Sequence, residues 1–197
     1  MKYLFQILVI CLTSLVGCKN DADYLVKKKD SKIYSSFEKI DSSHSNINFI
    51  NKITPSFDNK ANLFDYDYFY NGSGVGIADF NNDGLKDIIL SANQTENKIY
   101  VNKGGFVFED ITINANINEN KKWSSGVAIA DVNNDGWMDI YISQGGPNSA
   151  NNRKNLLYIN QKDLTFKEQA QEYGLADEGI STQSAFFDFD KDGDLDC

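Results

Sequence analysis

The feature that most restricts how this chain can fold is an internal repeat built around aspartate. A nine-residue pattern, with aspartate or asparagine at positions 1, 3, 5 and 9 and glycine at position 6, occurs three times. The copies begin at Asp79, Asp131 and Asp188, so they are 52 and 57 residues apart. A repeat of this length predicts one supersecondary unit per copy, stacked on its neighbours.

A second half-motif recurs with the first. The segment 97–102 (NKIYVN) returns as 155–160 (NLLYIN), an offset of 58 residues, which places a six-residue insertion near Gly145–Asn152. In the first unit, four β-rich runs separated by turn residues span about 75–80, 87–91, 98–102 and 106–111. Four short strands in about 50 residues predict an all-β chain of four-stranded antiparallel β-propeller blades.

The runs lack the 3.6-residue period of helical solenoids, and a parallel β-helix needs shorter rungs. Residues 47–53 also have the composition of a strand, which could close a ring or end a preceding blade. The third copy stops at Cys197. Since propellers have about four to eight blades, we expect a piece of a longer protein whose ring is incomplete.

The recurring oxygen-bearing side chains predict calcium sites. Calcium takes six to eight oxygen ligands, which these side chains and a main-chain carbonyl at position 7 can supply, while glycine at position 6 permits the sharp turn. The predicted metal ligands are Asp79, Asn81, Asp83, Leu85 and Asp87 in the first loop, Asp131, Asn133, Asp135, Trp137 and Asp139 in the second, and Asp188, Asp190, Asp192, Asp194 and Asp196 in the third.

Three other interpretations fit these loops less well. An EF-hand needs flanking helices and a glutamate at position 12, where this chain has Leu90 and Ile142. Asn-Asp-Gly could simply be a good hairpin turn, although all ligand positions recur in register. Magnesium is a poorer match, because it demands strict octahedral geometry and retains its waters.

The N-terminal residues predict a lipoprotein signal. Lys2 precedes an apolar run too short to span a bilayer, and the run ends in Leu15-Val-Gly-Cys18, which resembles a bacterial lipobox. We therefore expect a signal peptide over 1–17, lipidation of Cys18, a flexible tether over 18–44 and propeller repeats over 45–197. The alternative is an ordinary secretory signal. The expected location is the bacterial cell envelope, as an outer-membrane lipoprotein facing the periplasm or the surface.

Charge and composition favour a binding or scaffold module over an enzyme. The net charge of −9 argues against nucleic acid as a partner. No nucleophile–base pair, phosphate-binding glycine loop or second histidine accompanies His44, which we expect to be a solvated loop residue. The expected partners are calcium, the membrane through the lipid alone, and an unidentified protein or glycan. The alternative is the N-terminal part of a propeller enzyme acting on polysaccharide, with its catalytic residues in further blades.

Two features of the sequence are candidates for partner contact. The aromatic residues between 64 and 70 could form a glycan platform, although such residues more often pack a core. The insertion at Gly145–Asn152 is the better candidate, because inserted loops vary without disturbing a blade.

With these motifs in view, the chain resembles the FG-GAP and VCBS repeat family of calcium-binding propeller blades. More narrowly, residues 69–72 (FYNG), 123–131 (WSSGVAIAD) and 182–188 (TQSAFFD) resemble bacterial cartilage-acidic-protein-like lipoproteins that often carry an ASPIC/UnbV domain. The resemblance covers about 45–197. It implies an extracellular propeller for adhesion, ligand binding or assembly, with calcium stiffening the blades. The FG-GAP motif itself is degenerate in this sequence, and no ASPIC/UnbV segment is present.

Overall fold

The computed structural model describes residues 37–117, 122–147 and 153–197. The chain divides into two compact units, 1–39 and 40–197, and the second contains every strand named below. That unit begins with a single helical turn, α2 (Ser42–Ser45). Among the described residues, no helix has the length and apolar character needed to cross a bilayer.

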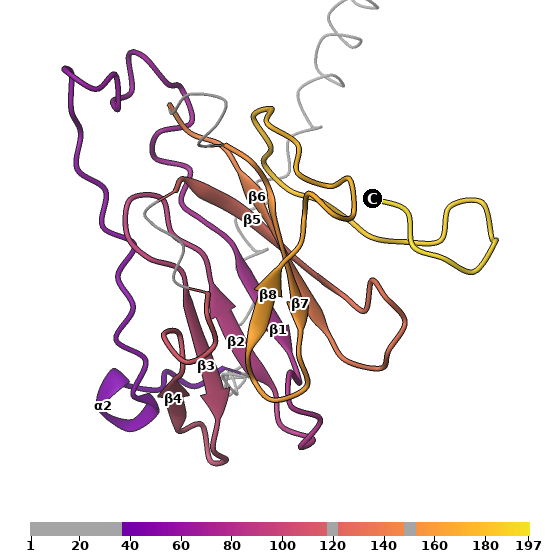
Figure 1. Cartoon of the computed structure of the whole chain (residues 1–197). Helices are drawn as coiled ribbons and strands as arrows, with labels where there is room; N and C mark the ends of the chain where they lie inside the picture. The colour runs from indigo at the N-terminus through magenta and orange to yellow at the C-terminus, as the bar shows by residue number, and fades with distance from the viewer. Residues whose placement is uncertain (1–36, 118–121, 148–152) are drawn as a thin grey trace, which may run out of the picture. The chain divides into compact units, whose positions relative to one another are not determined.

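The strands form two four-stranded antiparallel sheets, each in sequence order (Figure 1). Each sheet is one repeat unit folded as a meander, which confirms the predicted all-β, blade-like fold. The first sheet contains β1 (Val75–Ala78), β2 (Asp87–Leu90), β3 (Lys98–Asn102) and β4 (Phe108–Asp110), and the second contains β5 (Ser124–Ala130), β6 (Asp139–Gln144), β7 (Leu156–Asn160) and β8 (Phe166–Glu168).

The repeat is preserved in strand register. Ile88 of β2 pairs with Tyr100 of β3, and the corresponding residues Ile140 and Tyr158 pair between β6 and β7. The predicted bounds agree with the strands to within two residues. β4 begins later than expected because Phe106 has φ of 59°, a left-handed turn conformation that no strand residue adopts.

The two sheets pack face to face over one apolar core. Ile89, Ile99 and Val101 of the first sheet belong to the same buried cluster as Ile140 and Tyr158 of the second. β1 and β5, the innermost strands of the two sheets, approach each other closely. A Cβ built at Gly76 of β1 would lie only 2.8 Å from side-chain carbons of both Val127 and Ile129 of β5. The residues of this shared core are spread over both repeat units, so neither sheet buries this face alone.

The other face of the second sheet is covered by the chain that follows β8. Tyr141, Leu157 and Ile159 form a second buried cluster there, against which Leu175 and Phe186 pack. The Tyr141 hydroxyl also donates a hydrogen bond to the Leu175 carbonyl at 2.8 Å. β6 and β7 are therefore buried at every position.

The other face of the first sheet is only partly covered. The segment around α2 lies against it, and His44 Nε2 is 2.8 Å from the Gly105 carbonyl oxygen. Val75 and Ile77 remain 56% and 61% exposed. A cavity of about 470 Å³ opens between Ile77 and the α2 segment.

One predicted strand is wrong. Residues 47–53 are irregular and do not pair with a strand, and polar groups of Asn51 and of the adjacent Thr54 bond to side chains of the β2–β3 loop. Asn51 Nδ2 donates to Asn93 Oδ1 at 2.6 Å, and the Thr54 N–H donates to Gln94 Oε1 at 2.6 Å. The signal peptide, Cys18 and most of the expected tether lie outside the described residues, as does most of the insertion after β6.

Candidate metal centre

The three aspartate loops occupy the same place in their repeat units. The first connects β1 to β2 and the second connects β5 to β6. The third lies between Phe187 and Asp196, which form an isolated antiparallel bridge at the same position of the pattern. Strands, not helices, flank the first two loops, so the arrangement differs from an EF-hand.

The carboxylate at position 1 is bound by main-chain donors in every copy. Asp79 Oδ1 accepts a hydrogen bond from the Asp83 N–H at 3.1 Å, and its Oδ2 accepts one from the Gly84 N–H at 2.8 Å. Asp131 and Asp188 accept the corresponding pairs of bonds. The loop backbone is thus wrapped around its first aspartate.

Positions 3 and 5 continue this wrapping as successive Asx turns. In the first loop, Asn81 Oδ1 accepts from the Asp83 N–H, and Asp83 Oδ1 accepts from the Leu85 N–H. The same bonds recur in the other two copies. Positions 4 and 6 have positive φ, 56° and 88° in the first loop, which explains asparagine or lysine at position 4 and glycine at position 6.

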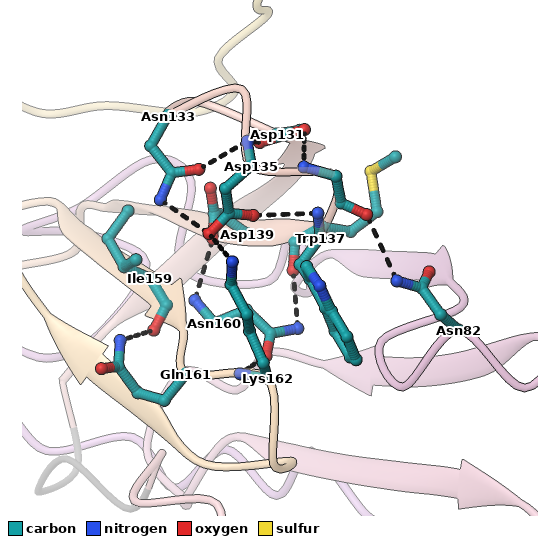
Figure 2. A network of polar contacts seen from close by, with 12 residues as sticks. Asn82, Asp131, Asn133, Asp135, Trp137, Asp139, Ile159, Asn160, Gln161 and Lys162 are labelled. Carbon is teal, nitrogen blue, oxygen red and sulfur yellow. Dashed lines mark hydrogen bonds and ion pairs between the residues drawn. The ribbon is translucent and has the colours of Figure 1, made fainter.

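In the first two loops, the carboxylate at position 9 is buried and joins three segments. Asp139 Oδ2 accepts from the Val132 N–H at 3.0 Å. Its Oδ1 accepts from the Asn160 N–H at 2.8 Å (Figure 2). Asp87 makes the matching bonds with Phe80 and Asn102. Position 9 therefore connects each of the first two loops to the end of the third strand of its sheet.

Sequence reasoning missed Asn102 and Asn160 as parts of this site. Besides their N–H groups, their side-chain amides donate to the carbonyls of Lys86 and Met138 at position 8. Asn160 Nδ2 also donates to the Phe80 carbonyl at 2.8 Å, which connects the second blade to the first loop. The available signal was their recurrence at the end of the second half-motif.

Burial and neighbouring charge disfavour the ionised forms of Asp87 and Asp139. Burial, opposed by the two main-chain donors and reinforced by Asp135 and Asp131, raises the pKa of Asp139 to about 6. The pKa of Asp87 is raised for the same reasons. A cation among these carboxylates would favour their ionised forms.

In the third loop, where position 3 is also an aspartate, three carboxylates lie close together. Asp188, Asp190 and Asp196 each place an oxygen within 4.8 Å of the others. Two oxygens bound to one calcium ion lie at most about 5 Å apart, because each bond is about 2.3–2.6 Å long. The donor set therefore fits calcium, and the equivalent residues of the first two loops adopt the same hydrogen-bonded conformation.

The main-chain carbonyl at position 7 is available as a further ligand. Among the described residues, the carbonyls of Leu85, Trp137 and Asp194 accept no main-chain hydrogen bond, whereas the position-8 carbonyls are bonded to asparagine in the first two loops. The prediction assigns position 7, and not position 8, as the main-chain ligand.

The second loop carries a lysine that the first lacks. Lys162 Nζ lies 3.3 Å from Asp135 Oδ2, while the corresponding residue of the first unit is Gly104 (Figure 2). Although burial alone would raise it, the pKa of Asp135 is lowered, because the Trp137 N–H and the Lys162 ammonium stabilise the carboxylate. The two loops also touch, since Asn82 Nδ2 donates to the Gly136 carbonyl at 3.3 Å.

Comparison with known proteins agrees with this geometry. Residues 79–142, from the first position of the first loop into β6, match the family model of the FG-GAP-like repeat. This part of the chain is therefore similar to an FG-GAP-like repeat, and the two four-stranded antiparallel sheets are consistent with propeller blades built from such repeats.

The chain is also distantly similar to a curated protein, cartilage acidic protein 1 of Xenopus tropicalis. The two are 32% identical over 77 residues, which cover 39% of this chain and 12% of that protein. The match therefore spans a small fraction of the relative's length.

Proposed function

We propose that this chain is a calcium-binding, lipid-anchored module of the bacterial cell envelope that mediates adhesion, ligand binding or assembly. The observation that carries the proposal is the repetition of one loop conformation three times, with three carboxylate oxygens within 4.8 Å in the third copy. A turn alone would require asparagine and glycine, but not carboxylates at both position 1 and position 9 of every loop.

Calcium would hold the carboxylates of each loop in their ionised form and join the loop to its blade. Asp139 supports this role, because one carboxylate contacts both the second loop and the end of β7. The ion would add a bond between segments that the hydrogen bonds already bring together. Calcium would then stabilise the blades mechanically and thermally.

Terbium luminescence tests the second loop directly. Tb³⁺ replaces calcium at oxygen sites and is sensitised by a nearby indole, which Trp137 supplies at position 7. We expect calcium-reversible luminescence from the full chain and its loss in Trp137→Leu, which copies Leu85 of the first loop. Trp123→Phe is the matched control, because Trp123 lies outside the loops. Luminescence that persists in Trp137→Leu, or that added calcium does not reduce, would argue against a calcium site in the second loop.

The lipid anchor rests on the N-terminal sequence and needs its own test. Metabolic labelling with an alkyne fatty acid in a bacterial host should mark the wild-type chain and Cys11→Ser, but not Cys18→Ser. Label retained in Cys18→Ser would remove the anchor from the proposal and leave the calcium module unaffected.

We propose a binding module and not an enzyme. The loop carboxylates, which are the regularly spaced acids of the chain, are bound by main-chain donors in each copy and are assigned here to calcium. A carboxylate held ionised by a cation is a poor general acid.

A further inference from the structure

A small pocket lies at the end of the innermost strands opposite the aspartate loops. It has a volume of about 190 Å³, and its walls include Tyr66, Tyr68 and Trp123 together with three hydroxyl residues, Ser73, Ser125 and Thr182. Ser73 precedes β1, whereas Asp79 follows it, so the pocket and the first loop are separated by the length of the strand.

The three hydroxyl residues occupy one position of the repeat. Each stands six residues before the first aspartate of its loop, at 73, 125 and 182. The innermost segments of three successive units therefore bring the same chemical group to one pocket. A repeat position that is serine or threonine in every copy supplies a set of converging donors and acceptors.

Two of these hydroxyl groups retain clear hydrogen-bonding capacity, whereas Ser73 Oγ already donates to the Ser124 carbonyl at 2.7 Å and lies 2.6 Å from Ser91 Oγ. Thr182 is exposed, and its hydroxyl makes no hydrogen bond to another described residue. Ser125 Oγ lies 2.6 Å from the Ser181 carbonyl and 3.0 Å from the Ser143 carbonyl. Since a hydroxyl has one proton and two lone pairs, Ser125 can still accept a bond from a ligand.

The aromatic walls are held in place by one another. The Tyr66 ring lies edge-on to Trp123, with centroids 5.7 Å apart, and edge-on to Tyr68 at 5.8 Å. The Tyr66 hydroxyl accepts a hydrogen bond from the Gly146 N–H at 3.3 Å. Trp123 is 4% exposed, whereas Tyr68 is 53% exposed and is the ring that a ligand would cover.

The lining indicates the class of ligand. Among the described residues, the pocket wall contains hydroxyl, amide and aromatic groups and no charged side chain. Its volume is below the roughly 300–1,000 Å³ of pockets for drug-sized ligands, so it suits a single ring. A ligand whose C–H face covers an aromatic ring and whose hydroxyls meet serine and threonine matches all three features.

We propose that this pocket binds one ring of a neutral saccharide. The proposal goes beyond the calcium module, because it uses none of the loop residues and does not require an ion. A quaternary ammonium group could also contact aromatic rings, but the converging hydroxyls favour the saccharide.

Saturation-transfer NMR on the full chain tests the proposal with methyl glycosides of glucose, galactose, mannose and N-acetylglucosamine at millimolar concentration. We expect transfer to at least one glycoside. Tyr68→Ala should weaken it by roughly ten-fold, as expected for loss of an aromatic contact. Thr182→Val, which keeps the shape and removes the hydroxyl, should weaken it by roughly three-fold.

The matched control is Tyr70→Ala, since Tyr70 is 61% exposed on the same segment but does not line the pocket. It should bind like the wild type. Unchanged thermal melting of all variants establishes that they are folded. Absence of transfer to every glycoside, binding unaffected by Tyr68→Ala, or transfer to choline alone would overturn the proposal.

Discussion

The two sheets have the same topology and register, but they differ in how their faces are buried. The second sheet packs against the first on one face and against residues 170–186 on the other. The first sheet shares the same core, yet Val75 and Ile77 on its other face are 56% and 61% exposed. In the second sheet, the equivalent Val127 is 7% exposed.

The comparison teaches that a repeat unit encodes a blade with two apolar faces, while its neighbours decide which faces are buried. Ile88 and Ile140 each follow the position-9 aspartate of their loop, but Ile88 is half-buried and Ile140 is completely buried. Predictions from equivalent residues in the two sheets can therefore separate what the repeat encodes from what packing adds.

The largest expected difference is between Ile140→Ala and Ile88→Ala. Truncating Ile140 should lower the free energy of unfolding by about 2–5 kcal/mol, because it leaves a cavity in the shared core. Truncating Ile88 should cost clearly less, since its site is already open to solvent. Urea denaturation in chelator measures both. Equal losses would mean that the first sheet's outer face is as well packed as the core.

The position-9 aspartates should show the next largest effect. Asp139→Ala leaves the N–H groups of Val132 and Asn160 without their acceptor, at about 1–3 kcal/mol for each buried group. Asp87→Ala is its counterpart in the first blade.

The loss should be larger for Asp139→Ala, because Asn160 also bonds to the Phe80 carbonyl of the first blade. The same denaturation experiment in chelator excludes any calcium contribution. A larger loss for Asp87→Ala would contradict the bridging role of Asn160.

The glycines at position 6 should behave alike in the two blades. Gly84 and Gly136 have φ of 88° and 86°, and neither has an atom within 4 Å of where a Cβ would lie. Alanine at either site should therefore cost about 1–2 kcal/mol from backbone strain alone. Differential scanning calorimetry of both variants checks this, and losses that differ strongly would show that the two loop conformations are not equivalent.

The smallest effect concerns Lys162, which partly neutralises the second loop. Lys162→Gln should strengthen Tb³⁺ binding at Trp137 by up to about five-fold, because a half-exposed ion pair contributes about 0–1 kcal/mol. Lys103→Gln is the matched control, since Lys103 pairs with Glu109 outside the loops. Weaker terbium binding in Lys162→Gln would mean that the lysine supports the site instead of competing with the cation.

Much of the fold could be predicted from the sequence because the repeat specifies local structure. All four strands of the first sheet could be predicted from glycine at position 6, alternating apolar residues and turn asparagines. The strand prediction for residues 47–53 was wrong, since an apolar composition does not reveal that Asn51 and the adjacent Thr54 bond to Asn93 and Gln94.

The ligand pattern was visible in the sequence, but the connections between loop and blade were not. Asn97 and Asn155 illustrate this limit, since both recur and both are buried. Their side-chain oxygens accept hydrogen bonds from the Ala92 and Gln144 N–H groups and thereby close the loops after β2 and β6. Which distant main-chain group an asparagine will reach depends on the folded geometry and not on spacing.

Calcium titration of the full chain by calorimetry, with thermal melts in calcium and in chelator, tests the central claim most directly. The account predicts binding heat with up to three sites and a melting temperature raised by calcium, because the ion binds the folded loops. If a folded sample gives no binding heat and no shift in melting temperature, the claim is contradicted. The aspartate loops would then be hairpin turns that bind no calcium.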